Sequence, residues 1–430
     1  MNMVVPRRQR LVVVGNGMAG ARALEEILAR APQAFDITVF GAEQHGTYNR
    51  IMLSPLLAGE KRFADIVTHD RAWFAANRIE QFSGEAVVAI DRRHRVVTSA
   101  RGTQRTYDVL LLATGSNPVM LPLPGATLSG VTSFRDVSDV NVMLDACRDG
   151  ERAVVIGGGL LGLEAAHGLS RNGMLVSVLH LMPTLMERQL DPLSAGLLAT
   201  DLQSCGIDVL TGVNTQAILG EDRVRAVLLA DGRELPADLV VMAVGVRPNC
   251  ALAKAAGLAC ARGIQVDGTM RSSDPHIYAV GECVEFCGQI FGLVAPIYDM
   301  AGICADHITG VADSRYEPGI AGTRLKVAGI EMFSAGDFLG DASTQAVVYR
   351  DIARGVHKRL VLRADRLVGA VLYGDARDSV WYFDLIQQGA DIGTMRDTLI
   401  FGPVVASGPA EHGAAATMLD EAQDCTAAVA

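Results

Sequence analysis

Short apolar runs rich in valine, leucine and isoleucine alternate along the chain with longer amphipathic segments. Runs of this kind are typical of buried parallel strands, and the segments between them of helices that pack on the sheet. The pattern predicts two strand–helix–strand units far apart in the sequence. The first comprises Leu11–Val14, Ala21–Arg30 and Asp36–Phe40, and the second comprises Ala153–Ile156, Leu163–Arg171 and Leu175–Leu181.

The first strand runs directly into a glycine-rich turn with the sequence GNGMAG. In such a turn the first glycine allows the tight bend, the second lets a pyrophosphate approach the backbone, and the third lets the helix pack against the strand. The helix N-terminus offers unpaired N–H groups to the phosphates, and an acid after the second strand can bind a ribose. These features predict a dinucleotide site formed by Gly15, Gly17, Met18, Ala19, Gly20 and Glu43.

The same turn follows the strand of the second unit, as GGGLLG. Here the ribose-binding acid is missing, because His180 stands where an Asp or Glu is expected, with Arg188 further on. Without that carboxylate a 2′-phosphate is not strongly repelled, yet one arginine is poor proof of NADPH binding. The choice between NADH and NADPH therefore stays open at this point. The expected contacts in this second turn are Gly157, Gly159, Leu160, Leu161, Gly162 and His180.

Two such sites in one chain indicate that two dinucleotides meet. The commonest physical purpose of that arrangement is hydride transfer from a nicotinamide to a flavin. We therefore predict FAD in the first site, NADH or NADPH in the second, and an FAD-dependent NAD(P)H oxidoreductase as the activity.

Three further segments fit this interpretation: Ala113–Ser116 (ATGS), Gly245–Asn249 (GVRPN) and Ile277–Glu282 (IYAVGE). Together with the glycine turns they resemble the motifs of the two-dinucleotide-binding flavoprotein superfamily, over about residues 10 to 400. The resemblance implies an α/β fold with two Rossmann-like domains of the glutathione-reductase type. The NAD(P) domain is then inserted in a split FAD domain, and a smaller α+β domain follows.

The resemblance also implies roles for individual side chains. Arg50 is expected near the FAD pyrophosphate or the isoalloxazine edge, and Glu164 near the nicotinamide and the flavin, so these two are the catalytic candidates. Glu282 replaces the Asp that the family usually has at the ribityl chain, and Pro296 is expected over the flavin pyrimidine ring. Further FAD contacts are Ala113, Thr114, Gly115 and Gly281, and a further NAD(P) contact is Gly245. No metal site is expected.

Within the superfamily, the chain most resembles the FAD/NAD module of assimilatory nitrite reductase large subunits and of nitrate reductase electron-transfer subunits. The motifs that carry this resemblance are GNGMAG, Tyr48-Asn49-Arg50 followed by Leu53-Ser54, GGGLLGLEAA, LMERQLD, YAVGEC and FGLVAP. After Cys304 the sequence has only Cys425, fewer than the four thiolates of a usual iron–sulfur cluster. We therefore expect a reductase that supplies electrons to a nitrate or nitrite reductase partner and does not itself reduce nitrite.

Disulfide reductases of the superfamily have a redox-active cysteine just after the first unit, where the thiolate can stack on the flavin. Residues 46–55 (GTYNRIMLSP) contain no cysteine, so we expect no active-site disulfide. Cys283 and Cys287 lie beside the ribityl motif and are expected to pack there. Related ferredoxin-type reductases have a lysine after the Leu-Ser pair, and Pro55 takes that place here.

The motifs predict the domain boundaries. The FAD domain is expected at 1–117 and 248–320, the NAD(P) domain at 118–247, the α+β domain at 321–405 and a flexible tail at 406–430. In related enzymes the α+β domain contacts the acceptor or a second subunit, so a homodimer is among the expected arrangements.

Composition narrows the setting. The chain has 430 residues and a net charge of −10, with no basic run, which disfavours nucleic-acid binding. No apolar stretch is long enough to span a membrane, and eight scattered cysteines without a C-x-x-C pair fit reduced thiols in the cytoplasm.

Two other functions stay open. One is a rubredoxin or ferredoxin reductase that feeds an oxygenase, since the same nucleotide sites serve it. The other is a redox sensor that binds both nucleotides but turns over slowly.

Overall fold

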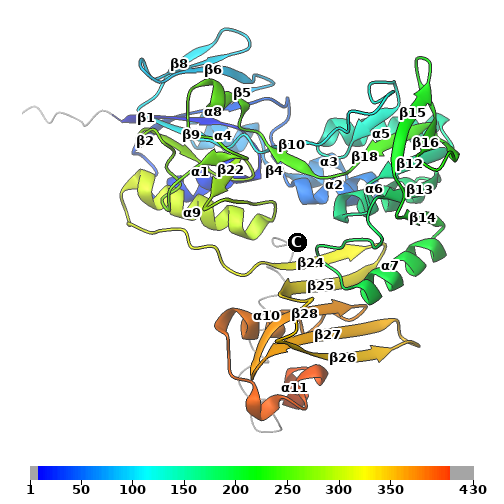
Figure 1. The fold of residues 1–430 in the computed structure, drawn as a ribbon. Helices are drawn as coiled ribbons and strands as arrows, with labels where there is room; N and C mark the ends of the chain where they lie inside the picture. Colours follow the sequence, from blue (N-terminus) through cyan, green and yellow to red (C-terminus); the bar gives the residue numbers. More distant parts are fainter. Residues whose placement is uncertain (1–7, 407–430) are drawn as a thin grey trace, which may run out of the picture. The chain divides into compact units, whose positions relative to one another are not determined.

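The computed structural model describes residues 8–406 (Figure 1). These residues group into two compact units, each assembled from separate stretches of chain. The first unit contains the residues up to Met52, Lys61–Asn117 and Val246–Pro318. The second contains Leu53–Glu60, Pro118–Gly245 and the residues from Gly319 onward.

A five-stranded parallel sheet in the order β21-β9-β1-β2-β5 forms the centre of the first unit. Its strands are β1 (Gln9–Val14), β2 (Phe35–Gly41), β5 (Glu80–Ser83), β9 (Val109–Leu112) and β21 (Ile277–Ala279). The apolar residues Leu11–Val14 of β1 and Leu110–Leu112 of β9 are all buried, as their unbroken apolar runs predict.

Two helices pack side by side in this unit, α1 (Met18–Arg30) and α9 (Val294–Thr309). Arg30 on α1 donates to Asp306 on α9 at 2.5 Å and fixes the pair. A three-stranded antiparallel meander joins β5 to β9 along the chain and comprises β6 (Val87–Asp91), β7 (Val96–Ser99) and β8 (Gln104–Thr106).

The second unit repeats this plan with a parallel sheet in the order β11-β18-β12-β13-β14. Its strands are β11 (Val131–Ser133), β12 (Arg152–Ile156), β13 (Leu175–His180), β14 (Ile207–Thr211) and β18 (Leu239–Met242). Its helices are α5 (Val137–Asp149), α6 (Leu160–Arg171) and α7 (Pro192–Ser204). A second antiparallel meander comprises β15 (Thr215–Gly220), β16 (Val224–Leu229) and β17 (Glu234–Pro236). In both sheets the strand before the glycine turn is central.

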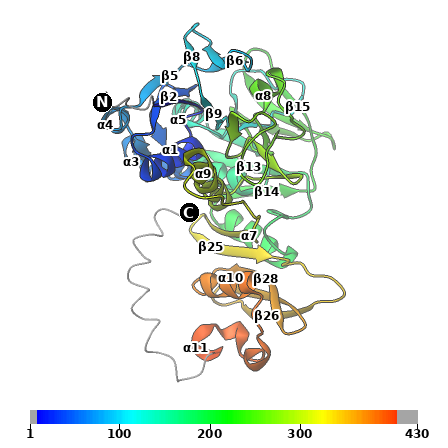
Figure 2. The ribbon, with the colours of Figure 1, turned by 90° about the vertical axis from the view of Figure 1, so that its left-hand side faces the viewer.

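An antiparallel sheet in the order β24-β25-β28-β27-β26 completes the second unit (Figure 2). The strands are β24 (Gly322–Val327), β25 (Ile330–Gly336), β26 (Gln345–Asp351), β27 (Val356–Arg363) and β28 (Arg366–Tyr373). Helix α10 (Ser379–Gln388) packs on β25 and β28, and a turn of 3-10 helix (Leu399–Phe401) with α11 (Pro403–Ala406) follows.

The α/β class and the two Rossmann-like sheets are confirmed. Both glycine-turn helices begin three residues earlier than predicted, at Met18 and Leu160, because a glycine serves as the N-cap of each. The domain boundaries remain a prediction. Contacts place Leu53–Glu60, which we expected in the FAD domain, in the second unit. The predicted tail at 406–430 lies, after Ala406, outside the described residues.

In residues 8–406, no helix has both the length and the apolar character that crossing a membrane requires.

A single buried hydroxyl ties α10 to the chain that follows it. Tyr382 is fully buried and donates to the carbonyl of Leu399 at 2.8 Å. Replacing Tyr382 by Phe removes this hydrogen bond, while the Leu399 carbonyl keeps the one from the Gly402 N–H at 3.2 Å, so we expect a loss of about 1 kcal/mol of stability. Thermal unfolding of Y382F would measure it. Tyr349→Phe is the control, because the Tyr349 hydroxyl forms no hydrogen bond among residues 8–406. An equal fall in melting temperature in both variants would contradict the expectation.

Candidate dinucleotide sites

The turn after β1 has the backbone geometry of a dinucleotide cradle. Gly15 has φ +114°, and a Cβ there would collide with the carbonyl oxygen of Ala113, which follows the neighbouring strand β9. A Cβ on Gly20 would collide with the carbonyl oxygen of Gly15. A Cβ on Gly17, by contrast, would meet nothing closer than Arg50 Nε at 4.0 Å. Protein atoms thus occupy the space beside the first and third glycines. The second glycine faces open space, where a pyrophosphate fits.

The turn after β12 reproduces this geometry. Gly157 has φ +126°, and a Cβ there would collide with the carbonyl oxygen of Ala243, after β18. A Cβ on Gly162 would collide with Gly157, whereas one on Gly159 would have no atom within 4 Å. Both cradles therefore fit a dinucleotide by the same test.

The helix that follows each cradle has an uncapped N-terminus. Gly17 is the N-cap of α1 and Gly159 is the N-cap of α6, and neither has a side chain that could accept from the first N–H groups. Neither helix has an acid in its first turn. The free N–H groups and the positive end of each helix dipole suit the two negative charges of a pyrophosphate. The predicted contacts Met18, Ala19, Leu160 and Leu161 lie in these first turns.

Glu43 and Arg50 lie together beside the first cradle. The Glu43 carboxylate accepts from the Tyr48 hydroxyl at 2.6 Å and forms an ion pair with the Arg50 guanidinium. Because Arg50 also lies over the open side of Gly17, its charge is placed for a phosphate. The structure thus brings together two predicted residues and adds a hydrogen bond from Tyr48, which was not predicted as a contact.

The ATG and IYAVGE motifs meet in the same unit. A Cβ on Gly281 would lie 2.7 Å from the Cβ of Ala19, which places the loop against the first turn of α1. Glu282 accepts from Ser116 Oγ at 2.8 Å, and Thr114 Oγ1 donates to the carbonyl of Asn249 at 2.6 Å. Of the other predicted FAD contacts, Ala113 and Gly115 lie in the ATG loop that follows β9. Pro296 lies in the first turn of α9.

His180, at the end of β13, contacts the second cradle. Its Nδ1 accepts from the N–H of Gly158 at 3.1 Å, and its Nε2 lies 3.0 Å from Glu187 Oε2. Both nitrogens of the His180 ring therefore have a hydrogen-bond partner. The predicted contact Gly245 has φ +112° and lies in the loop after β18, next to the strand end that Gly157 touches.

Glu164 lies on α6, two residues after Gly162, and accepts from Ser54 Oγ at 2.6 Å. Ser54 lies on the short helix α2 (Leu53–Leu57), which packs on α6. Burial raises the pKa of Glu164 to about 7, although the Ser54 hydrogen bond opposes this shift. Glu164 is thus a carboxyl group that exchanges a proton near neutral pH, the property expected of an acid–base residue.

Cys283 is fully buried under the ATG loop, and burial raises the pKa of its thiol. Cys287 is exposed, and both are free thiols. In the described part of the chain, no group of three His, Cys, Asp or Glu side chains is placed to hold a metal ion.

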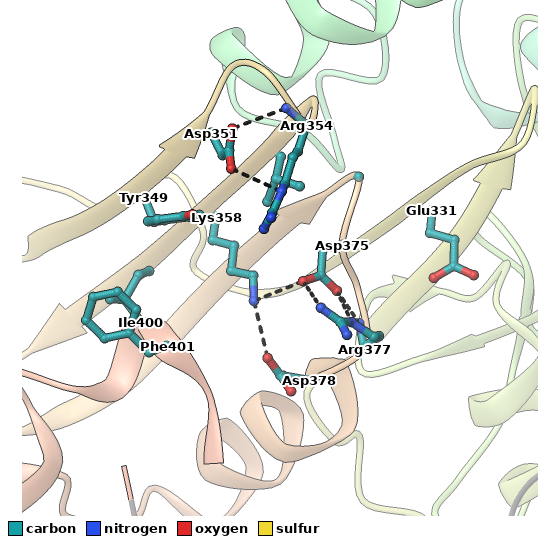
Figure 3. A pocket seen from close by; sticks show the side chains of 12 residues that line it. Glu331, Tyr349, Asp351, Arg354, Lys358, Asp375, Arg377, Asp378, Ile400 and Phe401 are labelled. Atoms are coloured by element: carbon teal, nitrogen blue, oxygen red, sulfur yellow. Dashed lines mark hydrogen bonds and ion pairs between the residues drawn. The ribbon is translucent and has the colours of Figure 1, made fainter. Parts of the chain in front are cut away.

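A hollow of about 630 Å³ lies on the antiparallel sheet of the second unit (Figure 3). Its charges neutralise one another. Lys358 lies 3.2 Å from Asp378 and 3.6 Å from Asp375, while Arg377 pairs with Asp375 at 2.9 Å. Glu331 and Asp351 likewise pair with Arg324 and Arg354. The hollow therefore offers no uncompensated charge to a nucleotide, and the two cradles remain the candidate sites.

The first cradle can be tested at its tightest point. In Gly15→Ala the new side chain meets the Ala113 carbonyl at an unfavourable φ, so we expect FAD content to fall by about tenfold or more, since more than about 1.4 kcal/mol is lost. The ratio of flavin to protein absorbance in purified samples measures this. Gly102→Ala is the matched control, because Gly102 has φ +84° with nothing within 4 Å. Full FAD content in G15A would show that the cradle tolerates a side chain.

The raised pKa of Glu164 predicts how stability depends on pH. The unfolded carboxyl ionises near its ordinary value of 4.5 and the folded one near about 7. Between these values the folded state holds the extra proton, so its stability falls as pH rises through this window and is constant above it. Glutamine does not titrate. We therefore expect the melting temperature of the wild type, relative to E164Q, to fall by a few degrees from pH 5 to pH 8, about 2–4 °C per kcal/mol. A pH-independent difference would show that Glu164 is ionised throughout.

Comparison with known proteins agrees with this geometry. Residues 9–301 match the family model described as pyridine nucleotide-disulphide oxidoreductase, and residues 322–390 match the rubredoxin NAD+ reductase C-terminal domain. A nitrite reductase [NAD(P)H] of Bacillus subtilis is 47% identical over 92% of this chain and 49% of its own length. An assimilatory nitrate reductase electron transfer subunit of the same organism is 41% identical over 94% of this chain and 53% of its own length. The chain thus spans about half the length of these two relatives.

Among solved structures, a ferredoxin reductase for the CYP199A2 system of Rhodopseudomonas palustris aligns with a TM-score of 0.80 and 30% identity. The alignment covers 89% of this chain and 98% of that one. The fold, the two cradles and the family match agree along most of the sequence. The chain belongs to the pyridine nucleotide-disulphide oxidoreductase family and is an FAD-dependent NAD(P)H oxidoreductase.

Proposed function

We propose that the chain transfers electrons from NAD(P)H, through FAD, to a separate nitrate or nitrite reductase partner. The observation that carries this proposal is the similarity to the two Bacillus subtilis proteins, which exceeds 40% identity over more than nine tenths of the chain. Bound at the two cradles, the nicotinamide would supply a hydride and the flavin would accept it and pass electrons on singly or in pairs.

In this scheme the protein's own residues bind and orient the two nucleotides and exchange a proton beside them. Arg50 and the α1 N-terminus hold the FAD pyrophosphate, Glu43 its ribose, and Glu282 its ribityl chain. The first turn of α6 holds the pyrophosphate of the nicotinamide nucleotide. Glu164 acts on the nicotinamide side as a carboxyl group that can take up or release a proton.

The absence of cysteine between Gly46 and Pro55 bears on the electron route. No thiolate of that segment can take part, so electrons leave the flavin without a dithiol step. Cys283 could contribute only as a neutral group, because its thiol is fully buried and its pKa is raised. We place the protein in the cytoplasm and allow for a homodimer through the 321–405 domain.

Rubredoxin or ferredoxin reduction is the second candidate. It is favoured by the match of residues 322–390 to the rubredoxin NAD+ reductase C-terminal domain and by the likeness to the Rhodopseudomonas palustris ferredoxin reductase. The nucleotide sites serve both functions equally. The two functions must therefore differ in the surface that binds the electron acceptor.

Stopped-flow mixing separates these functions. We expect anaerobic NADH or NADPH to bleach the yellow flavin band, and a nitrate or nitrite reductase partner to reoxidise the flavin about tenfold faster or more than rubredoxin or ferredoxin does, a difference of about 1.4 kcal/mol in barrier. Faster reoxidation by the small iron–sulfur proteins would favour the second candidate. Slow turnover with every acceptor would instead indicate a nucleotide-binding redox sensor.

A further inference from the structure

The end of β13 is where a Rossmann-like sheet reads the adenosine ribose of its nucleotide. His180 occupies that position, and an imidazole alone does not distinguish a 2′-hydroxyl from a 2′-phosphate by charge. The hydrogen bonds of the His180 ring define its tautomer. Because Nδ1 accepts from the Gly158 N–H at 3.1 Å, the ring proton lies on Nε2.

The Nε2–H group points at a carboxylate. Glu187 Oε2 lies 3.0 Å from Nε2, and the Glu187 side chain is 35% exposed. One carboxylate oxygen is therefore fixed by His180 while the other remains available to a ligand. An acid thus lies in the loop that follows the strand, seven residues after His180.

The backbone of the cradle holds this loop in place. Gly158 donates to His180, and its carbonyl accepts from the N–H of Met186 at 3.0 Å. A Cβ on Gly158 would lie 2.6 Å from Leu185 Cδ2 and 2.7 Å from His180 Cγ, so only glycine leaves room for both. Leu185 and Met186 are each 1% exposed and anchor the loop next to Glu187. The cradle, the histidine and the acid are therefore one connected arrangement.

We propose that Glu187, positioned by His180, reads the adenosine ribose and makes this site select NADH over NADPH. This inference rests on the proposed function and names its electron donor. The free carboxylate oxygen can accept a hydrogen bond from the ribose 2′-hydroxyl of NADH. A 2′-phosphate, with a charge of about −1.5 to −2, is repelled by the same oxygen.

Arg188 is the feature of this loop that opposes the proposal. It is exposed and forms no ion pair with the residues that the structure describes. An arginine can bind a 2′-phosphate, so its effect must be measured beside that of Glu187.

Calorimetric titration of the FAD-loaded protein with NAD+ and with NADP+ tests the proposal without turnover. We expect the wild type to bind NAD+ about tenfold more tightly or better, which corresponds to about 1.4 kcal/mol. Glu187→Gln should reduce the ratio of the two dissociation constants by at least about threefold, chiefly through tighter NADP+ binding. Glu187→Asp keeps the charge and should keep most of the ratio.

Glu234→Gln is the matched control. It removes the same charge from the same unit, at a side chain that is 50% exposed and faces Arg225 at 3.5 Å. Its ratio should equal that of the wild type. A ratio near one in the wild type, or an unchanged ratio in E187Q, overturns the proposal. So does a loss of NADP+ binding in Arg188→Ala larger than the gain in E187Q.

The outcome is separable from that of the proposed function. Equal flavin bleaching by NADH and NADPH, with equal binding, would overturn the role of Glu187 and leave the reductase function intact. A Glu187-dependent preference for NAD+ in a protein whose flavin neither nucleotide bleaches would support the role of Glu187 and overturn the reductase function.

Discussion

Both nucleotide sites depend on one close approach between backbones. In each sheet, the glycine that ends the central strand lies against the carbonyl oxygen of the alanine that follows the neighbouring strand, Ala113 in one case and Ala243 in the other. The approach exists because β9 pairs in parallel with β1 and β18 pairs in parallel with β12, so that within each sheet the two carboxyl ends lie at the same edge. No side chain fits there, and the chain must turn into a helix whose N–H groups remain free.

The two cradles have the same backbone geometry but differ in the polar side chains around them. In the first turn the residue between the first two glycines is Asn16, whose side chain accepts from Thr47 at 2.7 Å. In the second turn the equivalent residue is Gly158, because His180 and Leu185 fill the space that a side chain would need. The Arg50–Glu43 ion pair places both a cation and an acid beside the first cradle. The second cradle has the His180–Glu187 pair beside it. The same backbone geometry therefore has different charged neighbours in the two units.

The features that could be predicted from the sequence are those fixed locally. The strands and glycine turns follow from apolar runs and from φ values that only glycine adopts readily, so their positions were right to within a few residues. Glu187 could not be assigned, since a carboxylate seven residues after a strand has no fixed direction until Met186 and Leu185 anchor the loop. The contact of Ser54 with Glu164 could likewise not be predicted. The two residues are 110 residues apart, and only the packing of α2 on α6 joins them.

The Ser54–Glu164 contact also shows how one substitution changes the electrostatics of a site. A lysine at position 55 would supply a cation close to the serine that binds Glu164, and a nearby cation lowers the pKa of a carboxyl group. Pro55 supplies none, and among residues 8–406 the side-chain donor to this carboxyl group is the Ser54 hydroxyl. Burial then dominates and holds the pKa at about 7. Near pH 7 such a group is about half ionised, so it weakens the attraction of the α6 N-terminus for a pyrophosphate less than a fully ionised carboxylate would.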